Sequence, residues 1–171
     1  MSSPVLWLLR HGKAAESLGS PDAGRPLTAR GEAQSEEAGE TLARLGVVLA
    51  AVLTSPRVRA KHTAELAVAA HGSAPAPQIF DELGQDYDAK DLLALVSPWL
   101  DAAVGEGGSA GTEPAQDDAA PGPAVLVVGH NPTLTVVAHT LTGDERTLQT
   151  GTLVGIDLGK REVIHHVRAN A

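Results

Sequence analysis

Two residues that could bind and attack a phosphate group follow one another directly after an apolar run. Residues 5–9 read Val-Leu-Trp-Leu-Leu and lead into Arg10, His11 and Gly12. A guanidinium group carries a rigid fork of donors that matches phosphate oxygens, and an imidazole can serve as a nucleophile or acid–base group near neutral pH. The pair therefore favours an anion clamp beside a reactive histidine. A polar strand end without chemistry is the alternative, because three-residue motifs often arise by chance.

Two more apolar runs end in polar residues of the same kinds. Residues 47–53 precede a segment that contains Arg59, and residues 124–128 come shortly before His130. Apolar runs of this length, bounded by turn residues, are typical of strands buried on both faces of a sheet. Ligands of open α/β sheets bind beyond the carboxyl ends of such strands, where the polar side chains that follow would project.

Helical patterns lie between these strands. Thr28 is a good N-cap residue with Glu32 in the following turn, and Gly46 is a natural helix end. Pro56 suits the first turn of a second helix, which is expected to run to about His71. The remaining elements are expected as a helix opening at residues 88–91, a helix from about residue 132 to 143, and a hairpin of 152–158 with 162–167.

Composition limits the classes of function that the chain could have. Its 171 residues are expected to form one domain, 1–171, with a flexible loop at about 105–123, where apolar periodicity is missing. The absence of cysteine excludes disulfides and thiolate metal sites. Without a signal-peptide pattern or an apolar run of about 20 residues, a cytoplasmic protein with no membrane partner is expected.

The charge balance argues against a nucleic-acid partner, because the formal net charge is −8 and nucleic-acid surfaces are normally basic. A phosphate site in so acidic a chain would have to be a local basic pocket. The residues that could form it are Arg10, Lys13, Arg25 and Arg59.

Four motifs occur along the chain in a fixed order. They are Arg10-His11-Gly12, Arg25-Pro26-Leu27-Thr28-Ala29-Arg30-Gly31, Ser55-Pro56-Arg57-Val58-Arg59-Ala60-Lys61-His62-Thr63 and Val127-Val128-Gly129-His130-Asn131-Pro132. With them the sequence resembles the histidine phosphatase superfamily, and within it the short, phosphohistidine-phosphatase-like branch, over nearly its whole length. The resemblance implies a three-layer α/β/α sandwich with a mostly parallel central sheet, like that of phosphoglycerate mutase.

The resemblance also implies catalytic roles for four residues. His11 matches the family's nucleophile, which forms a phosphohistidine intermediate that water then hydrolyses. Arg10 and Arg59 match the arginines that clamp the phosphate, and His130 matches the second histidine beside it. No metal and no cofactor are implied. Arg57 is interpreted as a surface or rim residue, because charged side chains are mostly exposed.

A general acid is harder to assign. Mutase-like and broad-specificity members carry a dedicated acidic residue between the second arginine motif and the second histidine. Glu82 is the best-placed candidate here, with Asp86 and Asp88 behind it. Glu82 could equally cap a turn or pair with a surface arginine. The asparagine that mutase-like members carry shortly after their Arg-His-Gly motif is missing, which argues against a phosphoglycerate mutase.

These features predict a metal-independent phosphatase that acts on phosphohistidine in proteins or on a small phosphorylated compound. A broad-specificity phosphomonoesterase of the same fold and a non-catalytic phospho-binding module are the alternatives. The presence of His11 argues against the binding module, since binding alone needs no nucleophile. A metallohydrolase with His11 and His130 as ligands would lack the HExxH pattern and the cysteines that zinc sites commonly use.

Overall fold

A six-stranded sheet forms the centre of the molecule. The computed structural model describes residues 3–16, 19, 21–109 and 122–171. The strand order is β3-β2-β4-β1-β5-β6, in which β3, β2, β4 and β1 are parallel, β5 is antiparallel to β1, and β6 is antiparallel to β5. The strands are β1 (Val5–Arg10), β2 (Leu49–Thr54), β3 (Pro77–Ile79), β4 (Ala124–Gly129), β5 (Leu153–Asp157) and β6 (Glu162–Val167). The predicted, mostly parallel sheet is thus confirmed.

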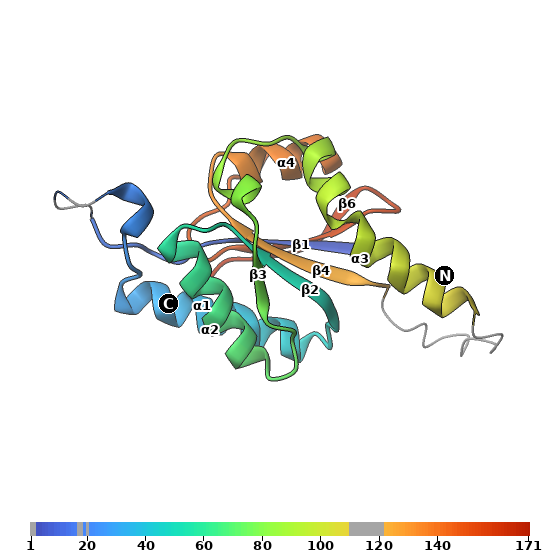
Figure 1. Cartoon of the computed structure of the whole chain (residues 1–171), viewed down its shortest axis with the longest axis horizontal. Coiled ribbons are helices and arrows are strands. Elements are labelled where there is room, and N and C mark those ends of the chain that lie inside the picture. Colours follow the sequence, from blue (N-terminus) through green and yellow to red (C-terminus); the bar gives the residue numbers. More distant parts are fainter. Residues whose placement is uncertain (1–2, 17–18, 20, 110–121) are drawn as a thin grey trace.

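Helices cover both faces of this sheet (Figure 1). One face carries α1 (Ala29–Arg44) and α2 (Val58–His71), and the other carries α3 (Ala89–Ser109) and α4 (Thr133–Thr142). Two short 3₁₀ turns, η1 (Asp22–Gly24) and η2 (Asp81–Gly84), complete the fold. The predicted three-layer α/β/α sandwich is confirmed, and none of the described helices is both long and apolar enough to cross a membrane.

The central strands are apolar on both faces because each face packs against helices. Every residue of β4 is buried, and so are the four central residues of β1. The pairing register sets Arg10 of β1 opposite Gly129 of β4, and Thr54 of β2 opposite Val128. The carboxyl ends of β1, β2 and β4 therefore lie at one edge of the sheet.

The helix ends follow their capping residues. Thr28 caps α1 by accepting a hydrogen bond from the Gly31 backbone N–H to its Oγ1 (3.1 Å). Gly72 after α2 and Gly143 after α4 adopt left-handed backbone conformations, with φ of 92° and 80°. Glycine is favoured at such helix ends because it has no Cβ to clash.

The loop expected at about 105–123 was placed too early. Helix α3 continues to Ser109, through Pro98, so residues 105–109 are helical, and residues 110–121 lie outside the described residues. The first part of α3 packs on the core through Leu92, Val96 and Leu100. Once packing has formed a helix, each further residue adds a backbone hydrogen bond at low cost, so the helix can outlast its apolar pattern.

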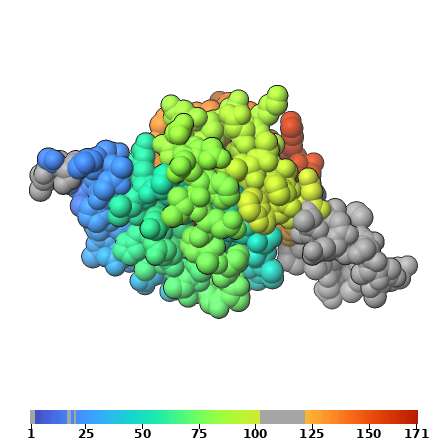
Figure 2. Space-filling view, in the orientation of Figure 1, coloured from blue at the N-terminus to red at the C-terminus, as the bar shows by residue number. Residues whose placement is uncertain are grey.

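The segment before α1 and helix α3 lie in different parts of the molecule. In Figure 2 the segment before α1 (blue) lies at one end of the molecule, and the described side chains of α3 (yellow-green to yellow) lie away from it. The blue end carries the carboxyl edge of β1, β2 and β4 (Figure 1).

Helices α1 and α2 approach each other closely at Gly39. A Cβ built on Gly39 would overlap the backbone carbonyl of Ala67 in α2 and lie 2.9 Å from the Ala67 Cα. Glycine at this position therefore allows the two helix backbones to touch.

Gly39→Ala should destabilise the protein, although alanine is the better helix former by about 1 kcal/mol. The backbone of Ala67 cannot rotate away as a flexible side chain could, so the helices must separate, at an expected net cost of about 1–3 kcal/mol. Denaturant unfolding would measure this loss. Gly24→Ala is the matched control, because a Cβ on Gly24 meets nothing within 4 Å. Equal stability of the two variants would contradict the close approach.

Candidate active site

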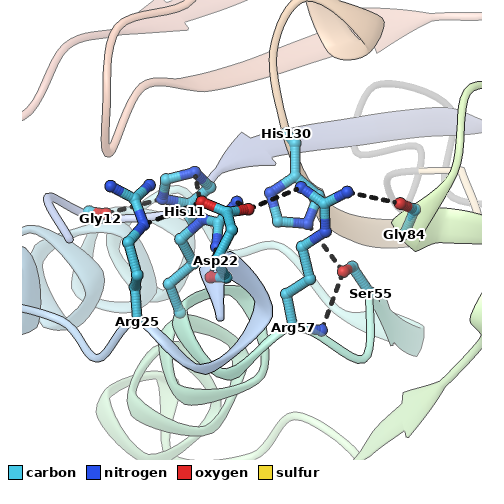
Figure 3. Close-up of polar contacts among 9 residues, drawn as sticks. His11, Gly12, Asp22, Arg25, Ser55, Arg57, Gly84 and His130 are labelled. Carbon is cyan, nitrogen blue, oxygen red and sulfur yellow. Dashed lines mark hydrogen bonds and ion pairs between the residues drawn. The ribbon is translucent and has the colours of Figure 1, made fainter. Parts of the chain in front are cut away.

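The residues that follow β1, β2 and β4 meet at the carboxyl edge of the sheet (Figure 3). His11 leaves β1, Arg59 lies in the first turn of α2, and His130 leaves β4. The ring centroids of His11 and His130 are 5.1 Å apart. Two of the sequence-predicted residues, the histidines, thus lie side by side, and Arg59 contacts one of them.

His11 is held as a neutral imidazole with a defined tautomer. Its side chain is only 6% exposed, and Nδ1 lies 2.7 Å from the carbonyl oxygen of Gly12. A carbonyl oxygen can only accept, so Nδ1 carries the proton and Nε2 keeps a lone pair. Burial above all, together with the positive charges of Arg59 and Arg10 and against the opposing effect of the Gly12 bond, lowers the pKa of His11 to about 4.

Two glycines let the loop after His11 approach α1. A Cβ on Gly12 would overlap the carbonyl oxygen of Gly31, and a Cβ on Gly31 would overlap that of Lys13. The backbone N–H of Gly12 donates to Thr63 Oγ1 (3.0 Å), and the Thr63 hydroxyl donates to the carbonyl of Arg59 (2.7 Å). Thr63 therefore connects the His11 loop to the helix that carries Arg59.

Arg59 is buried and points all three of its nitrogen groups into the site. The residue is 4% exposed, and its Nε donates to His11 Nε2 (3.3 Å). Nη1 donates to the backbone carbonyl of Asp22 (2.9 Å), and Nη2 donates to the Asp22 carboxylate (3.1 Å). A guanidinium in this position can present its fork to an anion directly beside the unprotonated nitrogen of His11.

His130 bonds to a serine that the sequence analysis did not place in the site. Its Nε2 lies 2.7 Å from Ser55 Oγ, and Ser55 Oγ also accepts from the backbone N–H of Arg57 (3.1 Å). His130 is 9% exposed, and burial, followed by the nearby His11 and Arg59, lowers its pKa to about 3. The position of Ser55 directly after an apolar strand was the signal that could have identified it.

Arg10 lies at the edge of the site nearest β5. Its Nη1 donates to the carbonyl of Leu148 (2.9 Å), which also accepts from Asn131 Nδ2 (2.7 Å). Burial and the charge of Arg59 lower the pKa of Arg10. Arg10 and Arg59 thus both add positive charge to the site.

Comparison with known proteins shows the family of the chain. Residues 6–88 match the family model of the histidine phosphatase superfamily, branch 1. The chain belongs to this superfamily. It is also 30% identical over 166 residues to an uncharacterised protein of Picosynechococcus, covering 94% of this chain and 89% of that protein.

Solved structures of histidine phosphatases share the fold. The proposed phosphohistidine phosphatase SixA from Agrobacterium tumefaciens has a TM-score of 0.73 at 21% identity and covers 98% of this chain and 99% of its own. The protein histidine phosphatase SixA complexed with tungstate has a TM-score of 0.68 at 25% identity and covers 96% and 94%. Phosphoglycerate mutase has the same fold, as the sequence predicted.

In this superfamily member, the arginine cluster holds an acidic residue that the sequence analysis missed. The Asp22 carboxylate lies 3.1 Å from Arg25 Nε, 3.1 Å from Arg59 Nη2 and 3.6 Å from Arg57 Nη1. Arg59 above all, then Arg25 and Arg57, hold the pKa of the Asp22 carboxyl below its usual range. Arg25 thus belongs to the cluster, and Arg57 lies at its rim.

Two of the predicted site residues lie elsewhere. Lys13 has an exposed side chain, and its backbone bonds to Gln34 and Thr28. Glu82 is exposed on η2, where it lines a pocket of about 460 Å³ together with Asp86 and Tyr87. No hydrogen bond joins the described part of the arginine and histidine cluster to either side chain, so the structure supports neither as a first contact for phosphate.

The buried histidines should make the free energy of unfolding depend on pH. Both have lowered pKa values in the folded protein, about 4 for His11 and about 3 for His130, against about 6.5 in the unfolded chain. Below pH 6.5 the unfolded chain binds protons that the folded protein does not, so stability falls as the pH decreases. Between pH 6.5 and 5 each histidine should contribute a loss of about 1.5 kcal/mol.

Urea unfolding at several pH values would test this. His11→Gln and His130→Gln should each lose less stability than the wild type over the same interval, because glutamine does not titrate. A pH dependence that is the same in all three proteins would contradict the burial of neutral imidazoles.

Proposed function

We propose that the protein is a metal-independent phosphatase that transfers a phosphoryl group to His11 Nε2 and then to water. The observation that carries this proposal is the state of His11, a neutral imidazole whose Nδ1 is tied to a carbonyl and whose Nε2 faces Arg59. A nucleophilic imidazole needs this tautomer, because the attacking nitrogen must keep its lone pair. A binding module has no need of it.

The chemistry follows from the positions of the charges. The substrate phosphate binds to the guanidinium groups of Arg59 and Arg10, which neutralise the equatorial oxygens. The lone pair of His11 Nε2 attacks phosphorus, and the bond to the leaving group breaks as the N–P bond forms. His130, placed 5.1 Å from His11 between ring centroids, holds the transferring group from the other side with Ser55 behind it.

Water then attacks the phosphohistidine. The N–P bond breaks, inorganic phosphate leaves, and His11 returns to its neutral form with the Gly12 carbonyl still holding Nδ1. The arginines provide the positive charge that a metal ion supplies in other phosphatases. In the described part of the chain no three histidine, aspartate or glutamate side chains come together to hold a metal ion.

The substrate class that we propose is phosphohistidine in a protein. The SixA relative that was solved with tungstate, a tetrahedral oxyanion, is a protein histidine phosphatase. The position of Glu82 supports the same class, because no carboxylate other than the arginine-bound Asp22 reaches the described site by a hydrogen bond. Expelling an imidazole from phosphorus needs an acid much less than expelling an alkoxide does.

A broad-specificity phosphomonoesterase is the second candidate. The observation in its favour is the pocket that Glu82 and Asp86 line, because Gly84, between the lining residues Leu83 and Gln85 in sequence, accepts a hydrogen bond from Arg57 Nη2 (3.0 Å). The leaving oxygen of a phosphate ester whose organic part lies in that pocket could receive a proton from one of these carboxyl groups and depart as an alcohol.

His11→Ala should lower kcat by more than about 1,000-fold, because no other described group offers a lone pair at this position. Rapid quenching of the wild type with ³²P-labelled substrate should leave the label on His11. Circular dichroism of the variant should match that of the wild type, since His11 ends a strand rather than filling the core. Label recovered on another residue, or on none, would contradict the assignment.

Glu82→Gln distinguishes the two candidates. For a phosphohistidine phosphatase, kcat/KM for a phosphohistidine peptide should exceed that for phosphoglycerate and alkyl phosphates, and the substitution should leave it nearly unchanged. If the protein is a phosphomonoesterase with Glu82 as its general acid, the substitution should lower kcat/KM for ester cleavage by about 100-fold or more. Asp81→Asn, next to it on η2, is the matched control for the loss of one charge. A preference for alkyl phosphates that disappears with Glu82 would support the phosphomonoesterase.

A further inference from the structure

The cationic centre of the site is occupied by a side chain of the protein itself. Figure 3 shows Asp22 between the side chains of Arg25 and Arg57. Oδ2 of Asp22 is 3.1 Å from Arg59 Nη2 and 3.6 Å from Arg57 Nη1, and Oδ1 is 3.1 Å from Arg25 Nε. One carboxylate thus forms ion pairs with three arginines.

The same nitrogens are those that a substrate phosphate requires. Arg59 directs Nε to His11 Nε2, whereas its Nη1 and Nη2 are both bound to Asp22, one to the carbonyl and one to the carboxylate. A phosphate that lies in line with His11 and receives the fork of Arg59 must take the Nη atoms from Asp22. Both anions cannot hold these donors at once.

We propose that Asp22 is an intramolecular competitor of the substrate phosphate, which must displace the Asp22 carboxylate from Arg59 in order to bind. Asp22 then sets the affinity of the site by excluding weakly bound anions. This inference rests on the proposed phosphate site and concerns its regulation.

The segment that carries Asp22 is built to be displaced at low cost. Turn η1 contains no buried residue, and the Asp22 side chain is 60% exposed. Two backbone hydrogen bonds of the turn, Gly24 N–H to Pro21 and Arg25 N–H to Asp22, lie within the segment itself. The contacts that tie it to α2 are therefore the arginine contacts, and the Asp22 side of these ion pairs is open to water, which weakens them.

Arg59 behaves differently from the turn. Its side chain is 5% exposed and its carbonyl is fixed by Thr63. Displacement of Asp22 would therefore leave the arginine in place, with its fork available beside His11.

Binding of tungstate, measured by isothermal titration calorimetry, tests the competition without catalysis. Asp22→Asn removes the carboxylate charge at nearly unchanged size, and its dissociation constant for tungstate should be roughly tenfold lower than that of the wild type, since a larger fraction of the protein is ready to bind. Asp22→Glu keeps a carboxylate on the same turn and should bind tungstate much as the wild type does.

Glu16→Gln is the matched control for charge. Glu16 is exposed in the loop that precedes η1, so its substitution changes the net charge equally. Its dissociation constant for tungstate should stay close to that of the wild type.

Three results would overturn the inference. Unchanged or weaker tungstate binding by Asp22→Asn would show that Asp22 does not compete and instead holds Arg59 in position. Equal tightening by Glu16→Gln would reduce the effect to general electrostatics. Failure of the wild type and all variants to bind tungstate would reject the proposed phosphate site itself, whereas the first two results leave that site intact.

Discussion

The register between β1 and β4 determines where the two histidines can lie. Because Arg10 pairs with Gly129, the next residue of each strand, His11 and His130, leaves the sheet at the same level on adjacent strands. The backbone N–H of His11 donates to the carbonyl of Gly129 (3.1 Å), which extends the pairing by one residue beyond β1. A shift of one residue would turn every side chain of β1 to the opposite face and separate the pair.

The arginines of the site repel one another, since like charges are gathered there in a small volume. Arg57 and Arg59 lie at the amino-terminal end of α2, where the helix dipole also disfavours cations. Asp22 balances this charge in the structure, and it does so from a turn on the surface rather than from the core. In a chain with a net charge of −8, the site is therefore basic only locally, and Asp22 offsets one of its positive charges.

Much of this arrangement was predictable from the sequence because buried strands, helix caps and the turns after them have strong local patterns. The strands around Leu8, Leu53 and Val127 and the cap at Thr28 were of this kind. Asp22 could not be predicted, since it lies in a turn without periodicity. Ser55 was a plausible neighbour of the site from its position after a strand, but a turn role explained it equally well, and its bond to His130 needed the structure. The extent of α3 beyond Pro98 and the outward direction of Lys13 also depend on packing that no local pattern records.

The connection between α3 and β4 begins and ends on the side of the sheet opposite the edge that carries His11 and His130. Helix α3 runs back from η2 toward the amino-terminal edge, where β4 begins at Ala124. The path from Ser109 to Ala124 thus starts and ends on the side of the sheet opposite His11 and His130 (Figure 1). A change of length between Ser109 and Ala124 would therefore begin and end on the opposite side of the sheet and should leave the positions of His11 and His130 unchanged.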